Sequence, residues 1–415
     1  KSDGTASGTV MVKDIYSGLS NSNLAELTAV GNTLYFRADD GVHGQELWKS
    51  DGTASGTVMV KDIHSGLNNG QPSDLTAIGS TLYFRASDGT NGAELWKSDG
   101  TASGTVMVKD IYSGGSTSSS SPNRLTAVGN TLYFRAGDGI NGQELWKSDG
   151  TASGTVMVKD INPTSNRGGS HPDYLTAIGS TLYFRAGDGT NGDELWKSDG
   201  TASGTVMVKD INSGSLSSNL NEFTAIGSTL YFRARDATNE YELWKSDGTA
   251  SGTVMVKDIR IGSVSSQLNT LTAVGNTLYF RADDGINGAE VWKSDGTASG
   301  TMMVHNIDIG AGGSYPQHLT ALGNTLYFQA DDGIHGRELW KSDGTASGTV
   351  LVQDIEGVNS ATPEELTVVG NTLFFRATDP TYGTELWALD PANITGLSGG
   401  SGGGMTNVTG ATCTV

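Results

Sequence analysis

Leu47-Trp-Lys-Ser-Asp-Gly-Thr-Ala-Ser-Gly-Thr-Val-Met-Val-Lys-Asp-Ile63 is the stretch that decides the fold, because the chain repeats it. The same seventeen residues return unchanged at 95–111, 145–161, 195–211 and 243–259, and altered copies occupy 291–307 and 339–355. Each of the eight tryptophans belongs to one copy: Trp48, Trp96, Trp146, Trp196, Trp244, Trp292, Trp340 and Trp387. Their spacings of 48, 50, 50, 48, 48, 48 and 47 residues are typical of a repeat architecture.

Each repeat contains four short runs of strand-forming residues separated by turn signals. In the first full unit the runs are 27–31, 33–38, 45–49 and 57–63. Gly31-Asn32 and the segment from Asp51 to Gly56 mark tight turns between them. No segment has a helical apolar period. The pattern predicts one four-stranded antiparallel blade per repeat.

The longer connections between repeats favour a propeller. They run 10 to 13 residues, enough to cross from the outer strand of one blade to the innermost strand of the next, three spacings of about 4.8 Å each. Residues 1–15 hold only a turn and the fourth run, and residues 366–390 hold only the first three. We therefore predict an all-β, eight-bladed β-propeller over residues 1–390, closed by strand exchange between the N- and C-termini. A linear solenoid is the alternative.

Residues 391–415 form a tail rich in Gly, Ser and Thr, and the run at 398–404 resembles a flexible linker. It holds two glycosylation sequons, at Asn393 and Asn407, and the only cysteine, Cys413. Cys413 is either a link to a partner chain in a larger assembly or an unused thiol. Since Lys1 falls inside a repeat and no secretion signal is present, we expect a processed or excised piece of a longer protein.

The charge balance argues against two classes of partner. Asp and Glu number 45 against 26 Lys and Arg, for a net charge of -19. Such a field repels phosphate backbones and anionic lipid, so we expect no nucleic-acid partner. No apolar run approaches the ~18 residues of a membrane span, so we expect no direct membrane insertion.

Variation between repeats is concentrated in the connections between blades and in the loop between the second and third runs. In a blade of antiparallel strands both sets of loops lie on one rim, called here the variable loop rim. One hypothesis is that this rim binds a ligand; the other is that unrestrained loops drift. The candidate ligand-binding residues are Asp39, Asp40, His43, His64, Tyr112, Tyr174, Arg235, Tyr241, Tyr315, His335 and Tyr382.

The other candidate sites have less support in the sequence. The tryptophans could stack on sugars, as in a lectin, but mid-strand residues between packed blades favour structural inter-blade packing. The Asp51 turn lacks the alternating carboxylates of a calcium loop, whereas the pair Asp39-Asp40 leaves calcium open. The six histidines show no metal-ligand spacing, and no catalytic constellation is present. We therefore expect no metal site, no other cofactor and no enzymatic activity.

The segment Glu46-Leu-Trp-Lys-Ser-Asp-Gly-Thr-Ala-Ser-Gly-Thr57 resembles the ELWxxDGT repeat of secreted and cell-surface bacterial proteins. The resemblance covers seven repeats, extends to Glu385-Leu-Trp387 in an altered form, and excludes the tail. It implies an extracellular or surface location and repeat-built binding or structural work. Eight blades with one Trp each are also similar to quinoprotein dehydrogenases, whose disulfide of neighbouring cysteines a single cysteine cannot form.

These observations lead to one functional prediction with three alternatives. We predict a non-enzymatic extracellular binding or assembly module that uses the variable loop rim to contact a protein or glycan at the cell surface. The alternatives are lectin-like glycan binding at repeated sites, a quinoprotein-type or hydrolytic enzyme with its site at the channel mouth, and a purely structural surface component.

Overall fold

The computed structural model describes residues 1–164, 168–262, 264–309, 312–355, 357, 359–390 and 405–407. These residues form strands, turns and loops, and none of them lies in a helix that could cross a membrane. The strands build eight four-stranded antiparallel sheets. The chain divides into two compact units, Met11–Leu220 and Lys1–Val10 together with Asn221–Val415, and each contains four of the sheets.

Four sheets belong to the unit Met11–Leu220. Their strands are β1 Ala25–Val30, β2 Thr33–Asp39, β3 Gln45–Ser50, β4 Val58–Lys61, β5 Ser73–Ile78, β6 Thr81–Ser87, β7 Ala93–Ser98, β8 Val106–Lys109, β9 Asn123–Val128, β10 Thr131–Gly137, β11 Gln143–Ser148, β12 Val156–Lys159, β13 Asp173–Ile178, β14 Thr181–Gly187, β15 Asp193–Ser198 and β16 Val206–Lys209.

The other four sheets belong to the second unit. Their strands are β17 Asn221–Ile226, β18 Thr229–Ala234, β19 Glu242–Ser246, β20 Val254–Lys257, β21 Asn269–Val274, β22 Thr277–Asp283, β23 Ala289–Ser294, β24 Met302–His305, β25 Gln317–Leu322, β26 Thr325–Asp331, β27 Arg337–Ser342, β28 Val350–Gln353, β29 Glu364–Val369, β30 Thr372–Asp379, β31 Gly383–Leu389 and β32 Met405–Asn407.

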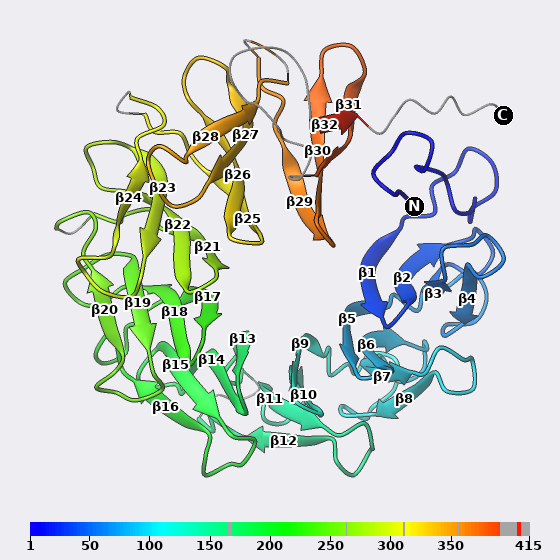
Figure 1. Cartoon of the computed structure of the whole chain (residues 1–415). Coiled ribbons are helices and arrows are strands. Elements are labelled where there is room, and N and C mark those ends of the chain that lie inside the picture. The colour runs from blue at the N-terminus through cyan, green and yellow to red at the C-terminus, as the bar shows by residue number, and fades with distance from the viewer. Residues whose placement is uncertain are drawn as a thin grey trace. The chain divides into compact units, whose positions relative to one another are not determined.

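Within every sheet the strands follow chain order, as in a propeller blade (Figure 1). In the first sheet Gly31, with φ +58°, makes the hairpin turn between β1 and β2, and Phe36 pairs with Trp48 across β2 and β3. The innermost strands of successive sheets lie side by side within each unit, for example β1 with β5 and β21 with β25. The predicted all-β fold of eight four-stranded antiparallel blades is confirmed.

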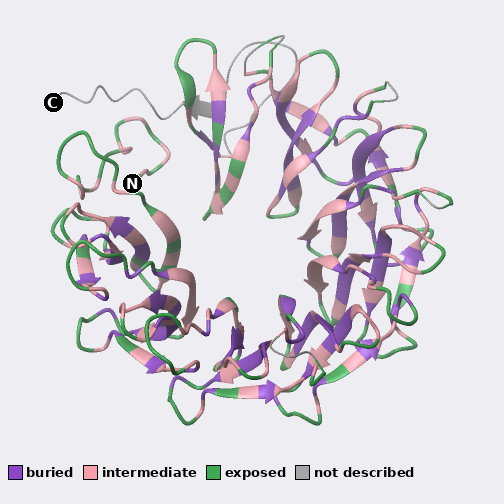
Figure 2. Ribbon diagram, turned by 180° about the vertical axis from the view of Figure 1, so that it is seen from behind, coloured by how far each residue is buried: buried purple, intermediate pink, exposed green. Residues whose placement is uncertain are grey.

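Hydrophobic side chains fill the space between neighbouring sheets. Tyr35 and Leu47 of the first sheet pack in one buried cluster with Phe84 and Trp96 of the second. Lys61 lies 5.9 Å from the ring centroid of Trp96 and donates a hydrogen bond to the Thr105 carbonyl at 2.8 Å. Buried residues accordingly follow the strands, while exposed ones gather in the loops (Figure 2). The repeated Trp is thus placed between sheets.

The Asp-Gly-Thr turn of each repeat also contacts the preceding sheet. Lys49 donates a hydrogen bond to the Gly100 carbonyl at 2.8 Å. Gly100 has a φ of +88°, and a Cβ there would lie 2.4 Å from the Tyr35 hydroxyl. Glycine is required at this position both by its backbone conformation and by the lack of space.

The structure corrects the prediction that the N-terminus completes the eighth sheet. The fourth strand of that sheet is β32, from the tail, which pairs with β31. Residues 10–13 form no strand, and Gly4 lies 3.9 Å from both Phe374 and Ala388, counting from its ideal Cβ position. Gly344 lies against Tyr279 of the preceding sheet in the same way. The N-terminal turn therefore occupies the position of a following repeat, because the edge of β31 is already paired.

A buried glutamate fixes each connection between sheets. Glu46 has no exposed surface, and its carboxylate accepts hydrogen bonds from the backbone N–H groups of Ile63, His64 and Gly70 at 3.0, 3.2 and 2.7 Å. Burial raises the pKa of Glu46 to about 7, and the three N–H donors only partly oppose that rise. The equivalent residues are Glu94, Glu144, Glu194, Glu242, Glu290 and Glu338.

We predict that these glutamates make the fold more stable in mild acid than above neutral pH. Burial raises the pKa of Glu194 from its ordinary 4.5 to about 7, so its contribution is complete below 4.5 and is lost as the pH rises through 7. Each such carboxyl group should remove roughly 1–3 kcal/mol from the free energy of unfolding over this range. Urea unfolding midpoints at pH 5 and pH 8 measure the loss.

The Glu194→Gln variant cannot titrate and should show a smaller difference between the two pH values than the unchanged chain. His43 also has a raised pKa because it bonds to Asp40, so His43→Asn serves as the control that leaves the glutamate contribution in place. A free energy of unfolding that stays constant or rises between pH 5 and pH 8 would contradict the prediction.

Candidate functional site

Each innermost strand begins with an irregular step. In β21 and β22 the pairing passes from Asn269 opposite Arg281 directly to Thr272 opposite Tyr279, and skips two residues. The first skipped residue has a φ near +55°, in the left-handed region, which is unusual for a residue other than glycine. This residue differs between most repeats, as Glu26, Asp74, Arg124, Tyr174, Glu222, Thr270, His318 and Glu365.

An acidic side chain of the preceding sheet accepts the N–H group of this left-handed residue in three cases. Glu26 accepts from the Asp74 N–H at 3.0 Å, and Asp74 accepts from the Arg124 N–H at 3.0 Å. Glu222 accepts from the N–H groups of both Thr270 and Leu271, at 3.0 and 3.3 Å. A protein carboxylate therefore fills each of these grooves between neighbouring innermost strands.

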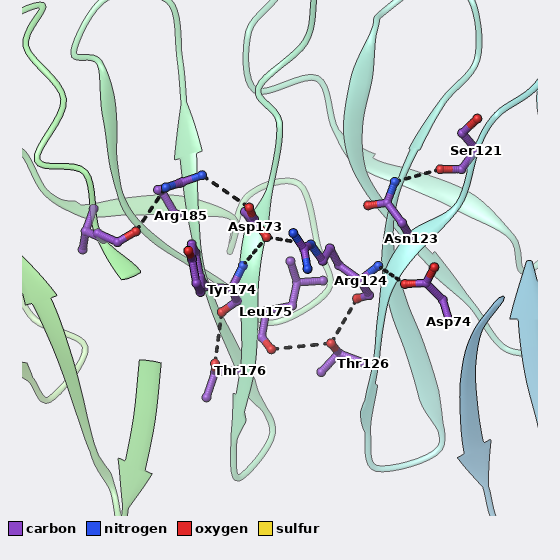
Figure 3. A network of polar contacts seen from close by, with 11 residues as sticks. Asp74, Ser121, Asn123, Arg124, Thr126, Asp173, Tyr174, Leu175, Thr176 and Arg185 are labelled. Carbon is purple, nitrogen blue, oxygen red and sulfur yellow. Dashed lines mark hydrogen bonds and ion pairs between the residues drawn. The ribbon is translucent and has the colours of Figure 1, made fainter. Parts of the chain in front are cut away.

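The groove between β9 and β13 receives its carboxylate from the other side (Figure 3). Arg124 takes the acidic position there, and Asp173 supplies the acceptor. Its Oδ1 atom lies 2.8 Å from Arg124 Nε and accepts the Tyr174 N–H at 2.9 Å, and its Oδ2 atom lies 3.3 Å from Arg185 Nη2. The Arg185 guanidinium also lies over the Tyr174 ring, 5.1 Å from its centroid.

The groove between β21 and β25 has Arg281 on its preceding sheet, Gln329 in place of the arginine of its following sheet, and neither carboxylate. Thr270 stands where the groove before it has Glu222, and Gln317 stands where Asp173 lies in the β9–β13 groove. A cavity of about 560 Å³ opens here. Its lining residues are Asn269, Thr270, Leu271, Thr272, Arg281, Gln317, His318 and Leu319.

Arg281 is the charged centre of this cavity. Its side chain is half-buried, and its Nε atom, like those of Arg37, Arg135 and Arg185, is buried without a hydrogen-bond partner among the residues that the structure describes. Burial lowers the pKa of Arg281, while the negative charge of Glu222 opposes that change. Its counterparts Arg185 and Arg376 form ion pairs with Asp173 and Glu364 of their own sheets. The neutral residue Asn269 occupies the equivalent position beside Arg281.

A pattern in the sequence indicates this site, but the predicted ligand-binding residues belong to the variable loop rim and do not include Arg281. The second strand of seven repeats holds an arginine in the run Phe-Arg-Ala, and only Gln329 replaces it. A constant charge in the middle of a strand calls for a partner at each repeat. Comparison of the left-handed positions then shows four places where the preceding side chain is not an acid, Arg124, Tyr174, Thr270 and His318. Thr270 and His318 line the cavity.

Three of the predicted rim residues, Asp40, His43 and His335, belong to local Asp–His pairs. Asp40 Oδ2 lies 2.8 Å from His43 Nδ1, and Asp332 and His335 repeat this pair at 2.7 Å. Asn91 occupies the place of His43 in the second sheet and donates to Asp88 at 2.8 Å. The Asp–His pairs therefore hold the loop between the second and third strands, and the Asp raises the pKa of each His.

The structure does not gather the remaining predicted rim residues at one place. The rings of His64 and Tyr112 cover Gly89 and Gly139 of the next sheet, and Asp39 accepts the Gly41 N–H at 2.7 Å. The other candidates are Tyr174 and Tyr315 at the entry to an innermost strand, Arg235 over the Tyr241 ring at 6.0 Å, and the exposed Tyr382. Asn393 and Cys413 lie outside the described residues, and Asn407 belongs to β32.

Neither a metal cluster nor a nucleophilic triad occurs in the described part of the chain. No three His, Cys, Asp or Glu side chains come together there in a way that could hold a metal ion. The histidine rings of those residues bond to Asp40, to the Asn69 carbonyl and to Asp332, and to no serine or cysteine. The described residues therefore give no evidence of catalysis.

No protein-family model matches the chain, and no curated protein matches it. Solved structures of similar fold include puromycin hydrolase, 15% identical over 80% of this chain and 53% of its own, with a TM-score of 0.43. A prolyl endopeptidase is 10% identical over 89% of this chain and 54% of its own, with a TM-score of 0.46. Prolyl oligopeptidase B from Galerina marginata is 10% identical over 90% and 55%, with a TM-score of 0.45. The chain spans about half the length of these proteins.

These comparisons overturn the functional prediction made from the sequence. It described a non-enzymatic extracellular binding or assembly module that acts through the variable loop rim, whereas the structures of similar fold are those of hydrolases and peptidases. The likeness concerns the fold alone. The function of this chain therefore has to be argued from its own groove.

We predict that Asp173 stabilises its groove through the two arginines. The Asp173→Gln change copies Gln317 and leaves Arg124 and Arg185 without a carboxylate, so the free energy of unfolding should fall by about 1–2 kcal/mol. Chemical denaturation of Asp173→Gln, Arg124→Thr and the double variant would measure the coupling. The double variant should lose less than the sum of the single losses. Strictly additive losses would show that the pair contributes nothing.

Proposed function

We propose that the protein binds the carboxylate group of a ligand in the groove between β21 and β25. One observation carries the proposal: the cavity in this groove is lined by Arg281 and by the backbone step that donates N–H groups in its neighbours, and its lining contains no acidic side chain. Thr270 and Gln317 occupy the two positions from which the chain supplies a carboxylate elsewhere. A ligand carboxylate would take the vacant place.

The backbone of the groove supports this assignment. The pairing of β25 with β26 passes from Gln317 to Thr320 and skips His318 and Leu319. The equivalent residues one sheet earlier, Thr270 and Leu271, donate their N–H groups to Glu222. His318 has a φ of 54°, so its backbone repeats the conformation of Thr270. The same two donors therefore face the β21–β25 groove.

The electrostatics favour an anion of low charge. Arg281 is half-buried, and charge-assisted hydrogen bonds to a carboxylate are stronger than neutral ones, each contributing roughly 1.5–3 kcal/mol. Donors fixed by the strand backbone lose little conformational entropy on binding. The net charge of -19 opposes the approach of a highly charged polyanion. A single carboxylate satisfies the arginine without that repulsion.

The family and location of the chain belong to the proposal as well. The repeated Glu46–Thr57 motif supports membership of the ELWxxDGT repeat proteins and action at or outside the cell surface. Fractionation of the source cells, with protease treatment of intact cells, would test the location. Recovery of the protein in the cytoplasm alone would contradict it.

We predict that Arg281→Gln weakens carboxylate binding at least 10-fold, because the charged partner is lost while the side chain still fills the site. The chain itself uses glutamine at this position in the next sheet, as Gln329, so the fold should tolerate the change. Titration with acetate and with glutarate, followed through the amide resonances of His318 and Leu319, measures the affinity.

Two further variants serve as controls for this measurement. Thr270→Glu places a carboxylate in the groove as Glu222 does in the groove before it, and should abolish ligand binding with the fold intact. Arg37→Gln, in the other unit, should leave the affinity unchanged. Equal carboxylate affinity in the Arg281→Gln variant and the unchanged chain would reject the proposed function.

A further inference from the structure

We infer that the ligand of the β21–β25 groove is an acidic side chain carried by a peptide segment, with glutamate preferred over a free small acid or an inorganic anion. This inference rests on the proposed function and names its ligand class. It is drawn from the protein's own acidic residues in the neighbouring grooves, from the size of the cavity and from the polar groups that line it.

The neighbouring grooves show how such a ligand is held. In three of them, the carboxylate belongs to the left-handed residue at the start of an innermost strand. Glu26 reaches across in this way to the Asp74 N–H, and Glu222 reaches to the N–H of Thr270, each at 3.0 Å. The groove type therefore already recognises a glutamate side chain presented by a strand. In the β21–β25 groove that strand has to come from outside.

The longer arm of glutamate explains the preference over aspartate. Glu222 accepts hydrogen bonds from two successive N–H groups, those of Thr270 and Leu271. In the corresponding contacts Asp74 accepts the Arg124 N–H and Glu26 accepts the Asp74 N–H. Since His318 and Leu319 repeat the backbone step of Thr270 and Leu271, the ligand that best satisfies both donors is the one with the reach of Glu222.

The cavity is larger than a carboxylate needs. Its volume of about 560 Å³ lies in the range of pockets that hold ligands of many atoms, roughly 300–1,000 Å³. Leu271 and Leu319 give it apolar surface on which methylene groups can pack. Acetate or phosphate would leave most of this volume to water. A glutamate side chain together with a part of its own backbone would occupy it.

Amide side chains at the groove match the backbone of a peptide. Asn269 uses its Oδ1 atom to accept the Thr270 N–H at 2.8 Å, which leaves its NH₂ group to donate to a carbonyl. Gln317 adds one further acceptor and one NH₂ donor at the opposite strand. Acetate has no donor for the Gln317 acceptor, whereas a peptide presents both N–H and C=O groups.

The test compares four probes on the full chain: the capped tripeptides acetyl-Ala-Glu-Ala-amide and acetyl-Ala-Gln-Ala-amide, acetate, and inorganic phosphate. Calorimetry and the His318 and Leu319 amide resonances report binding. We expect the Glu tripeptide to bind at least 10-fold more tightly than acetate, and the Gln tripeptide and phosphate to bind at least 10-fold more weakly than the Glu tripeptide. Arg281→Gln should weaken both carboxylate probes.

A second variant distinguishes contacts to the peptide backbone from contacts to the carboxylate. Gln317→Ala should weaken the Glu tripeptide at least threefold and leave acetate unchanged, because acetate does not reach the amide. If acetate or phosphate binds as tightly as the Glu tripeptide, the peptide inference falls while anion binding stands. If none of the four probes binds, both the inference and the proposed function fall.

Discussion

The hydrogen bonds of the buried glutamates are the interaction on which the rest of the structure depends. Glu242 holds the N–H groups of Ile259 and Ser266, and so fixes the connection that leads into β21. Glu290 holds those of Ile307 and Ser314 and fixes the entry to β25. The two walls of the β21–β25 groove are therefore positioned by carboxylates that lie outside it. Loss of either glutamate would therefore shift a wall of the groove, although neither glutamate lines it.

The same physical rule explains why the grooves differ. A backbone donor or a half-buried arginine in a narrow space needs an acceptor, and the chain meets this need with whichever acid lies in reach. Glu222 comes from the preceding sheet, whereas Asp173 comes from the following one. These two solutions occupy different repeat positions, so a comparison of single positions hides their equivalence. Only the geometry shows that both place a carboxylate near an arginine and a left-handed N–H group.

The sequence was sufficient for the parts of the fold that one repeat determines by itself. Four strands per repeat and the pairing of Phe36 with Trp48 follow from residues within a single blade. The sequence was insufficient where the structure depends on which of two distant segments pairs with a strand. The edge of β31 pairs with residues 405–407, which carry no copy of the repeat, and not with the repeat-like residues 10–13. Arg281 was missed for the same reason, since its environment is set by residues about ten before it and more than thirty after it.

A repeat protein can thus acquire a binding site when one groove lacks the side-chain carboxylate that other grooves contain. Seven of the eight blades contain the arginine, all contain the left-handed backbone step, and four grooves contain a carboxylate that accepts a backbone N–H group. Replacement of that carboxylate by Thr270 and Gln317 opens a cavity without any change in the scaffold. The cavity then contains the half-buried Arg281 and no acidic side chain in its lining. In the proposed function, an external carboxylate supplies the acidic group that the lining of this cavity lacks.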